Sequence, residues 1–131
     1  METGDMVTFD FASHAHEWLA AWNAHDLERI LAHYSEDVDL TSPFVSKLMG
    51  QGEHSVRGKT ALRDYFARGL RAYPTLRFDF IGLYPGVRSC VLEYRRENGM
   101  HTAELMEFDE HSKVRRVLAH YRNDPSGTNQ A

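Results

Sequence analysis

The stretch that decides the fold covers residues 14–44, HAHEWLAAWNAHDLERILAHYSEDVDLTSPF. Its first part carries apolar side chains three and four residues apart, which is the spacing of one helix face. Residues 23–26 interrupt this spacing and therefore predict two short helices, the second capped by the Asp26 carboxylate. Over residues 38–42 the pattern alternates with a period of two, and Pro43 cannot donate to a strand ladder. The stretch thus predicts two helices that turn directly into one strand.

Length and composition limit the class of protein. A chain of 131 residues suits one domain, and 42% apolar residues suffice for a core but are too few for a membrane protein. No apolar run approaches the roughly 20 residues that span a bilayer, and residues 1–13 lack the apolar segment of a secretory signal. The single cysteine, Cys90, fits a reducing cytoplasm, and the net charge of −4 argues against a general nucleic-acid binder. We expect a cytoplasmic protein with neither a membrane nor a nucleic-acid partner.

The rest of the chain predicts one further helix and a strand meander. Residues 44–56 contain two glycines and little periodicity, which indicates a flexible flap with a short helical turn near residues 46–49. Residues 60–73 return to helical spacing, with Thr60 as the N-cap and Pro74 as the stop. Alternating segments, each a predicted strand, follow at residues 76–84, 89–96, 101–108 and 114–122.

The predicted fold class is α+β, with the element order α-α-β, flap, α-β-β-β-β. The three helices are expected to pack on one face of a strongly curved, mainly antiparallel sheet. We place an N-terminal lead-in at residues 1–13, a single domain at 14–123 and a disordered polar tail, DPSGTNQA, at 124–131.

Three motifs resemble a known family. They are W-x3-WNAHDLERILAHYSEDVDLTSPF at residues 18–44, VRGKTALRDYF at 56–66 and AELMEFDEHSKV-x4-AHY at 103–121. With these motifs the chain resembles the nuclear transport factor 2-like superfamily, and within it the SnoaL-like and ketosteroid isomerase-like bacterial branch. The resemblance implies a cystatin-like cone, in which a curved sheet wraps around a long helix above a deep pocket. It also implies a homodimer that forms through the outer sheet face.

The resemblance implies positions for acid/base groups as well. The ketosteroid isomerase pattern has a carboxylate base just before the proline that ends the first strand, and here that position is Ser42. The tyrosine of its first helix aligns with Trp18, and the second acid on a late strand aligns with Glu104. Because a serine hydroxyl without a base cannot shuttle a proton at neutral pH, we do not expect the steroid isomerase mechanism.

Glu104 is the candidate catalytic residue. Strand alternation places it on the pocket side, and a carboxyl group among apolar neighbours has a raised pKa that suits a general acid or base. The other interpretation is that Glu104 hydrogen-bonds Trp18, Tyr34 or a buried water and only stabilises the fold. The further residues expected to line the pocket, as ligand contacts or simply as core, are Trp18, Trp22, Tyr34, Leu40, Ser42, Phe44, Phe66, Met106 and Tyr121.

Several polar side chains are expected on the surface. His14 and His16 open the first helix and are expected to be solvated. Arg95 and Arg96 are expected to give the outer sheet face positive charge, balanced by glutamates on neighbouring strands. Alternation leaves open whether Tyr94 points into the pocket or out of the sheet.

Two classes of function remain open. One is a SnoaL-like cavity enzyme, acting as a cofactor-independent isomerase, cyclase, dehydratase or hydrolase on a small apolar molecule. The other is a non-catalytic ligand-binding or dimerisation module of the same fold. We expect no metal and no cofactor, because neither a metal-ligand spacing nor a Gly-rich phosphate loop occurs in the sequence. The expected partners are a small apolar molecule and a second copy of the chain.

Overall fold

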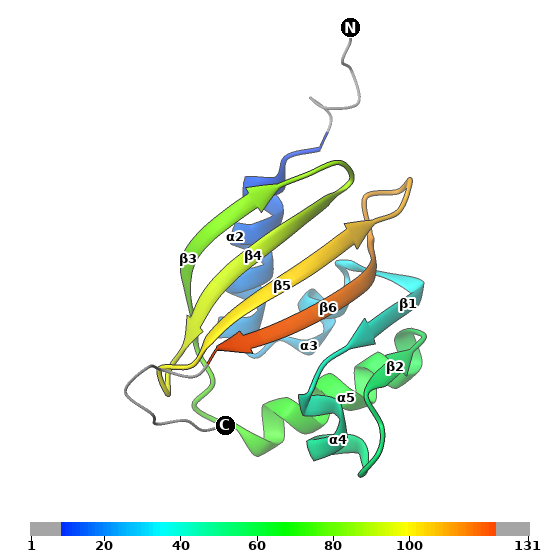
Figure 1. The fold of residues 1–131 in the computed structure, drawn as a ribbon, viewed down its shortest axis with the longest axis vertical. Helices are drawn as coiled ribbons and strands as arrows, with labels where there is room; N and C mark the ends of the chain where they lie inside the picture. Colours follow the sequence, from blue (N-terminus) through cyan, green and yellow to red (C-terminus); the bar gives the residue numbers. More distant parts are fainter. Residues whose placement is uncertain (1–8, 123–131) are drawn as a thin grey trace, which may run out of the picture.

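The computed structural model describes residues 9–122, which form a curved six-stranded sheet with helices against its inner face (Figure 1). The strand order is β2-β1-β6-β5-β4-β3. Strands β1 and β6 run parallel, whereas all other neighbouring strands are antiparallel. This arrangement confirms the predicted α+β cone. The helices are α2 (Phe11–Asn23), α3 (Leu27–Leu31), α4 (Phe44–Met49) and α5 (Lys59–Ala72), and the strands are β1 (Tyr34–Thr41), β2 (Ser55–Arg57), β3 (Phe78–Pro85), β4 (Ser89–Arg96), β5 (His101–Phe108) and β6 (Val114–Arg122).

Helix α2 begins at Phe11, earlier than the sequence pattern predicts. Asp10 is its N-cap, since the Asp10 carboxylate accepts hydrogen bonds from the backbone N–H and the hydroxyl of Ser13 at 3.0 and 2.8 Å. Phe9 and Phe11 pack around the Phe108 ring and hold this first turn on the sheet. Part of the predicted lead-in is therefore helical. Residues 1–8 and the predicted tail at 124–131 lie outside the described residues.

The turn into β1 is tighter than expected. Asp26 is confirmed as the cap of α3, because its carboxylate accepts from the Arg29 N–H at 3.2 Å. The helix ends at Leu31, however, and Tyr34, whose spacing from Ile30 and Leu31 fits the same helix face, opens β1. Tyr34 is the register partner of Val114, so pairing with β6 starts there, and a register shift follows before Asp39. Tertiary pairing thus replaces a turn of helix that the local spacing favours.

The flap carries more structure than predicted. Its helical turn is present as α4, and its last residues form β2, which the sequence analysis missed. Strand β2 pairs antiparallel with β1, with Val56 opposite Leu40. Thr60 is not the N-cap of α5, because the helix already starts at Lys59 and Gly58 occupies the cap position. Gly58 has a φ of +87°, in the left-handed region that glycine adopts without strain.

The meander follows the predicted segments closely. Strands β4, β5 and β6 have the predicted bounds, whereas β3 starts at Phe78 instead of Leu76. Asn23 at the end of α2 explains this start, because its side-chain amide accepts from the Phe78 N–H at 2.7 Å and donates to the Phe78 carbonyl at 2.9 Å. None of the helices within residues 9–122 has the length and hydropathy needed to cross a bilayer.

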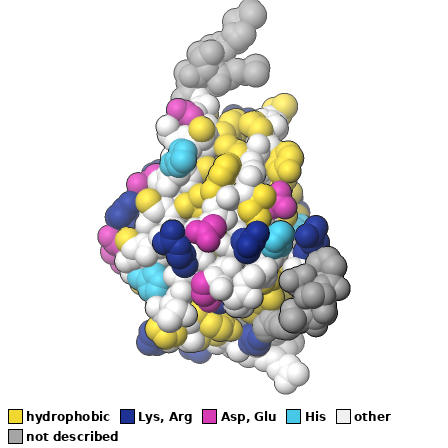
Figure 2. Space-filling model, turned by 90° about the vertical axis from the view of Figure 1, so that its left-hand side faces the viewer, with side chains coloured by type: hydrophobic (Ala, Val, Ile, Leu, Met, Phe, Trp, Pro, Cys, Tyr) yellow, Lys and Arg dark blue, Asp and Glu magenta, His cyan; other side chains and the backbone are white. Residues whose placement is uncertain are grey.

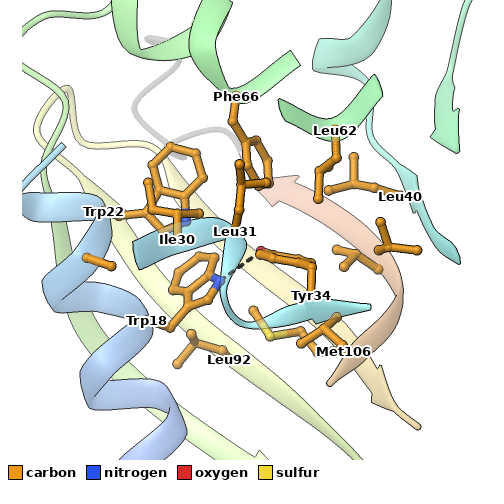
Figure 3. Close-up of a cluster of buried hydrophobic side chains, with 14 of the residues drawn as sticks. Trp18, Trp22, Ile30, Leu31, Tyr34, Leu40, Leu62, Phe66, Leu92 and Met106 are labelled. Atoms are coloured by element: carbon orange, nitrogen blue, oxygen red, sulfur yellow. Dashed lines mark hydrogen bonds between the residues drawn. The ribbon is translucent and has the colours of Figure 1, made fainter. Parts of the chain in front are cut away.

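The core lies where α2, α3 and α5 meet the inner sheet face. Figure 3 shows Trp18 from α2 and Tyr34 from β1 facing each other, with Leu31 and Phe66 beside them. The Trp18 Nε1–H donates to the Tyr34 hydroxyl at 2.8 Å, and both side chains are fully buried. This bond satisfies two polar groups that would otherwise destabilise the core. Both side chains also line the cavity described below, so the bond fixes part of its wall.

Candidate functional site

A cavity of about 90 Å³ lies between the inner sheet face and helices α2, α4 and α5. Most of its wall is aromatic, and the sheet side adds a single carboxyl group, that of Glu104. The cavity is small compared with the roughly 300–1,000 Å³ of pockets for drug-sized ligands. The residues named from the sequence that line it are Trp18, Trp22, Tyr34, Leu40, Ser42, Phe44, Phe66, Glu104 and Tyr121.

Met106 is the exception, and its expected place in the cavity wall was wrong. Its side chain is fully buried in the core, where its Sδ lies 3.5 Å from the His14 Nε2. Met106 shares the inner face of β5 with Glu104, as alternation requires. It lies one repeat further along the strand, however, where the first turns of α2 cover the sheet. Strand periodicity gives the face of a side chain but not which helix covers it.

Glu104 occupies the middle of β5, opposite Leu92 on β4 and Ala119 on β6. Only 8% of the residue is exposed. Its Oε2 accepts a hydrogen bond from the Tyr94 hydroxyl. Burial raises the pKa of Glu104 from 4.5 to about 7, and the hydrogen bond from Tyr94 opposes part of that rise. The carboxyl group is therefore present in both protonation states near neutral pH.

Tyr94 is the hydrogen-bond partner that the sequence analysis left undecided. It points inward from β4 and is fully buried. The partners expected for a purely structural Glu104, Trp18 and Tyr34, instead bond to each other. Burial, and next the charge of Glu104, raises the pKa of Tyr94 well above its ordinary value. Tyr94 is consequently a neutral donor at physiological pH.

Two further phenols border the cavity. Burial raises the pKa of Tyr65 to about 12, and burial followed by the Glu104 charge also raises that of Tyr121. The Tyr121 and Ser42 hydroxyls lie 3.2 Å apart. A neutral phenol can donate a hydrogen bond to a ligand oxygen, and a carboxyl group with a pKa near neutrality can give or accept a proton.

Ser42 holds the backbone rather than providing a base. Its Oγ accepts from the Phe44 N–H at 3.1 Å, in addition to its contact with Tyr121. The hydroxyl thereby fixes the first turn of α4 at the cavity edge. The position at which the ketosteroid isomerase pattern has its base thus carries a group with a structural role.

Arg96 lines the cavity, which corrects its expected place on the outer sheet face. The residue is 7% exposed, and its guanidinium carbon lies 4.7 Å from the centre of the Tyr73 ring. The alternating burial of β4 places Arg96 on the same face as Tyr94. A strict period of two from Cys90 would have found it, but the charge favoured the surface assignment.

The histidines do not contribute to the cavity wall. His54 is exposed and His101 is half-buried, and neither lines the cavity. His14 was expected in solvent but is buried beside Phe108 and His33. Within residues 9–122, no group of three or more His, Cys, Asp or Glu side chains is arranged to hold a metal ion.

A curved sheet with helices packed on its inner face is the fold of the nuclear transport factor 2-like superfamily. The chain belongs to the SnoaL-like domain family, whose sequence profile matches residues 15–122. This confirms the resemblance seen in the sequence. No curated protein matches the chain.

Two crystal structures show the same fold. A SnoaL-like protein of unknown function from Burkholderia thailandensis is 35% identical with a TM-score of 0.81, and the match covers 86% of this chain and 93% of that one. A candidate isomerase of the SnoaL-like family from Agrobacterium tumefaciens is 16% identical with a TM-score of 0.69, covering 86% and 97%. The second likeness concerns the fold alone.

Proposed function

We propose that the protein binds a small, mainly apolar molecule in this cavity and that Glu104 transfers a proton to or from it without a cofactor. The observation that carries the proposal is the buried Glu104 carboxyl group, whose pKa of about 7 lies close to physiological pH. An acid or base is most effective when its pKa matches the working pH, because both forms are then populated. We also propose a cytoplasmic location, because Cys90 is a free cysteine and cysteines stay reduced in the cytoplasm.

The surrounding phenols define what this proton transfer would accomplish. Tyr94 donates to Glu104, and Tyr121 lies on the same cavity wall. A ligand carbonyl oxygen that accepts from the Tyr121 hydroxyl becomes more polarised, which acidifies the carbon next to it. Glu104 then takes a proton from that carbon and returns it elsewhere. Isomerisation, cyclisation and dehydration of a small carbonyl compound share this step.

Small cyclic ketones test the proposal without knowledge of the natural substrate. In D2O, the protein is expected to accelerate exchange of the hydrogens next to the carbonyl of cyclopentanone or cyclohexanone, followed by proton NMR. The rate should rise from pH 6 to pH 8, because the carboxylate form of Glu104 is the base. Glu104→Gln is expected to lower the rate by about 10²- to 10⁴-fold.

Glu107→Gln is the matched control, because Glu107 lies on the same strand but on the outer face, where it pairs with Arg116 at 3.0 Å. This variant should retain the rate of the unmodified protein. Equal exchange by the Glu104→Gln variant and the unmodified protein would contradict the acid/base role.

A non-catalytic binding module is the second candidate, and the packing of the rings supports it. The Phe78 ring stacks on Tyr94 with centroids 4.2 Å apart and on Trp18 at 5.7 Å. These rings fill much of the space between sheet and helices, and the Tyr94–Glu104 bond then only fixes the wall. Binding of the ketones, followed by the fluorescence of Trp18 and Trp22, without accelerated exchange would favour this candidate.

The outer sheet face supports a homodimer, which we propose as the assembly. Tyr84, Val91, Leu105 and Leu118 are register partners in one row across four strands, and all point away from the helices. Tyr84 is 59% exposed and the other three are half-buried. Figure 2, viewed from the β3 side, shows hydrophobic side chains gathered above a band of charged ones. An apolar row of this kind is self-complementary across a two-fold axis.

Leu105→Glu is expected to convert the dimer into a monomer, because it places a charge in the centre of the apolar row. Light scattering after gel filtration should give twice the 15.1 kDa chain mass for the unmodified protein and the single mass for the variant. Ala20→Glu, on the exposed side of α2, is the matched control and should remain dimeric. A monomeric unmodified protein would contradict this assembly.

A further inference from the structure

We propose that the ligand of the cavity carries a carboxylate group and that Arg96 binds it. The inference rests on the proposed function, since it names the chemical class of the molecule in the same cavity. It assigns Arg96 the role of a specificity-determining residue, separate from the acid/base role of Glu104. The evidence comes from the burial of Arg96, from its partners and from its place along β4.

Two protein contacts fix the orientation of the Arg96 guanidinium group. Its Nη2–H donates to the Glu97 carboxylate at 3.0 Å, and its flat face lies over the Tyr73 ring. Glu97 is itself held in place, because its other oxygen accepts from the Arg77 N–H at 3.0 Å. Glu97 and Tyr73 therefore orient the guanidinium group of Arg96 at the cavity wall.

The Nε–H of Arg96 has no such partner. The atom is buried, and no acceptor for it occurs within residues 9–122. A buried donor without an acceptor destabilises the folded state by about 1–3 kcal/mol, so proteins rarely leave one unless a ligand or water completes it. If Arg96 only fastened the end of β4 to the end of α5, the contacts with Glu97 and Tyr73 would suffice. The unused donor beside the cavity indicates an acceptor on the ligand.

A carboxylate fits this position better than a neutral oxygen. Hydrogen bonds between a guanidinium group and a carboxylate are charge-assisted, shorter and roughly twice as strong as neutral ones. Arginine keeps its charge at all physiological pH values and is less strongly hydrated than lysine, which suits a site that is more than nine-tenths buried. Glu97 neutralises part of the Arg96 charge but leaves the Nε–H free.

The register of the sheet sets the distance between the backbone positions of Arg96 and Glu104. Arg96 lies four positions along β4 from Leu92, the register partner of Glu104. At about 3.3 Å per residue, the two backbone positions are roughly 13 Å apart along the strand. Tyr94 lies between them along β4, and Phe78, the register partner of Arg96, stacks on the Tyr94 ring. The expected ligand is therefore a small carboxylic acid with an apolar body, which has its carboxylate at Arg96 and its reacting carbon at Glu104.

Phenylacetate and phenylacetamide test this inference, because they have nearly the same shape and differ in charge. Binding is measured by the change in fluorescence of Trp18 and Trp22, which line the cavity, and by saturation-transfer NMR. The unmodified protein is expected to bind the carboxylate about tenfold more tightly than the amide, as one charge-assisted hydrogen bond provides. Arg96→Met should remove this preference and leave binding of the amide unchanged.

Arg95→Met is the matched control, because Arg95 is the neighbouring residue on the exposed outer face. It should keep the tenfold preference. Equal affinity for both probes in the unmodified protein, or a preference that survives Arg96→Met, would overturn the inference and leave the cavity proposal intact. Failure of both probes to bind would overturn the two together. The comparison of the two probes on the unmodified protein decides the matter even if Arg96→Met fails to fold.

Discussion

Glu104→Gln is expected to stabilise the protein at pH 8 by about 3 kcal/mol relative to the unmodified protein and to leave its stability nearly unchanged at pH 4. The size follows from the pKa of Glu104, which burial raises from 4.5 to about 7, at 1.36 kcal/mol for each pH unit. The glutamine amide has almost the shape of the protonated acid and still accepts from Tyr94. It does not ionise, so the cost of a buried charge is absent.

The sign follows from proton binding. Between pH 4.5 and about 7 the folded protein keeps the proton on Glu104 whereas the unfolded chain has lost it. The contribution of Glu104 to stability is therefore complete below pH 4.5 and is lost as the pH rises through 7. Urea unfolding followed by tryptophan fluorescence, at intervals from pH 4 to pH 8, measures the difference in the free energy of unfolding. A difference that does not change with pH would show that Glu104 is not buried as described.

His14→Leu is expected to remove a loss of stability that occurs in acid. Between pH 7 and pH 4, the free energy of unfolding of the unmodified protein should fall by about 3 kcal/mol relative to that of the variant. Burial, and next the positive charge of His33, lowers the pKa of His14 from 6.5 to about 4. The unfolded chain therefore binds a proton below pH 6.5 that the folded protein does not accept until about pH 4. The stabilising effect of neutral His14 is complete above pH 6.5 and is lost as the pH falls to 4.

The surroundings of His14 explain why it stays neutral. Its ring packs against His33 and Phe108 at centroid distances of 5.1 and 4.9 Å, and its Nε2 faces the Met106 sulfur. None of these groups provides the negative charge that would stabilise a protonated ring. A leucine fits the same apolar surroundings and does not titrate.

His16→Leu is the matched control for His14→Leu, because His16 lies on the exposed side of the same helix. Unfolding experiments at pH 4, 5, 6 and 7 should show a free-energy gap between the His14→Leu variant and the unmodified protein that widens as the pH falls. The gap for His16→Leu should vary far less. The same gap at every pH for His14→Leu would contradict the burial of a neutral His14.

The two residues have opposite effects over the same pH range. Between pH 4.5 and 6.5, His14 makes the free energy of unfolding rise with pH, while Glu104 makes it fall by nearly the same amount per unit. The contributions of these two residues therefore cancel in the unmodified protein. When one of the two residues is replaced, the free energy of unfolding should change with pH as the remaining residue dictates. The two variants together therefore test the burial of both His14 and Glu104.

Local sequence signals predicted most of the helices and strands, and the resemblance of three motifs predicted the family. The spacing of apolar residues around Trp18 predicts a helix, and their alternation predicts strands β4, β5 and β6. Both patterns can be seen in the sequence because they reflect which side chains face the core. Elements fixed by pairing partners were missed. Strand β2 is too short for a recognisable period, and it forms because β1 offers an open edge.

In the candidate site, too, local patterns predicted some features, and others required the tertiary structure. Alternation was enough to place Glu104 on the inner face of β5, whereas its hydrogen bond with Tyr94 required the register between β4 and β5. The charge of Arg96 suggested the surface, and only the packing of Tyr73 and Glu97 around its guanidinium group shows why it is buried.

The sequence by itself determined the cone fold, the family and the face of the sheet that carries the buried acid. The face of the sheet follows from strand periodicity, which acts between residues close together in the chain, whereas the family and its cone fold were implied by the resemblance of three motifs. The tertiary structure alone decided that Glu104 meets Tyr94, that Arg96 keeps an unused donor beside the cavity and that His14 is sealed against Met106. These depend on burial and on contacts between distant strands and helices, because desolvation and the nearest charges set the pKa of each group.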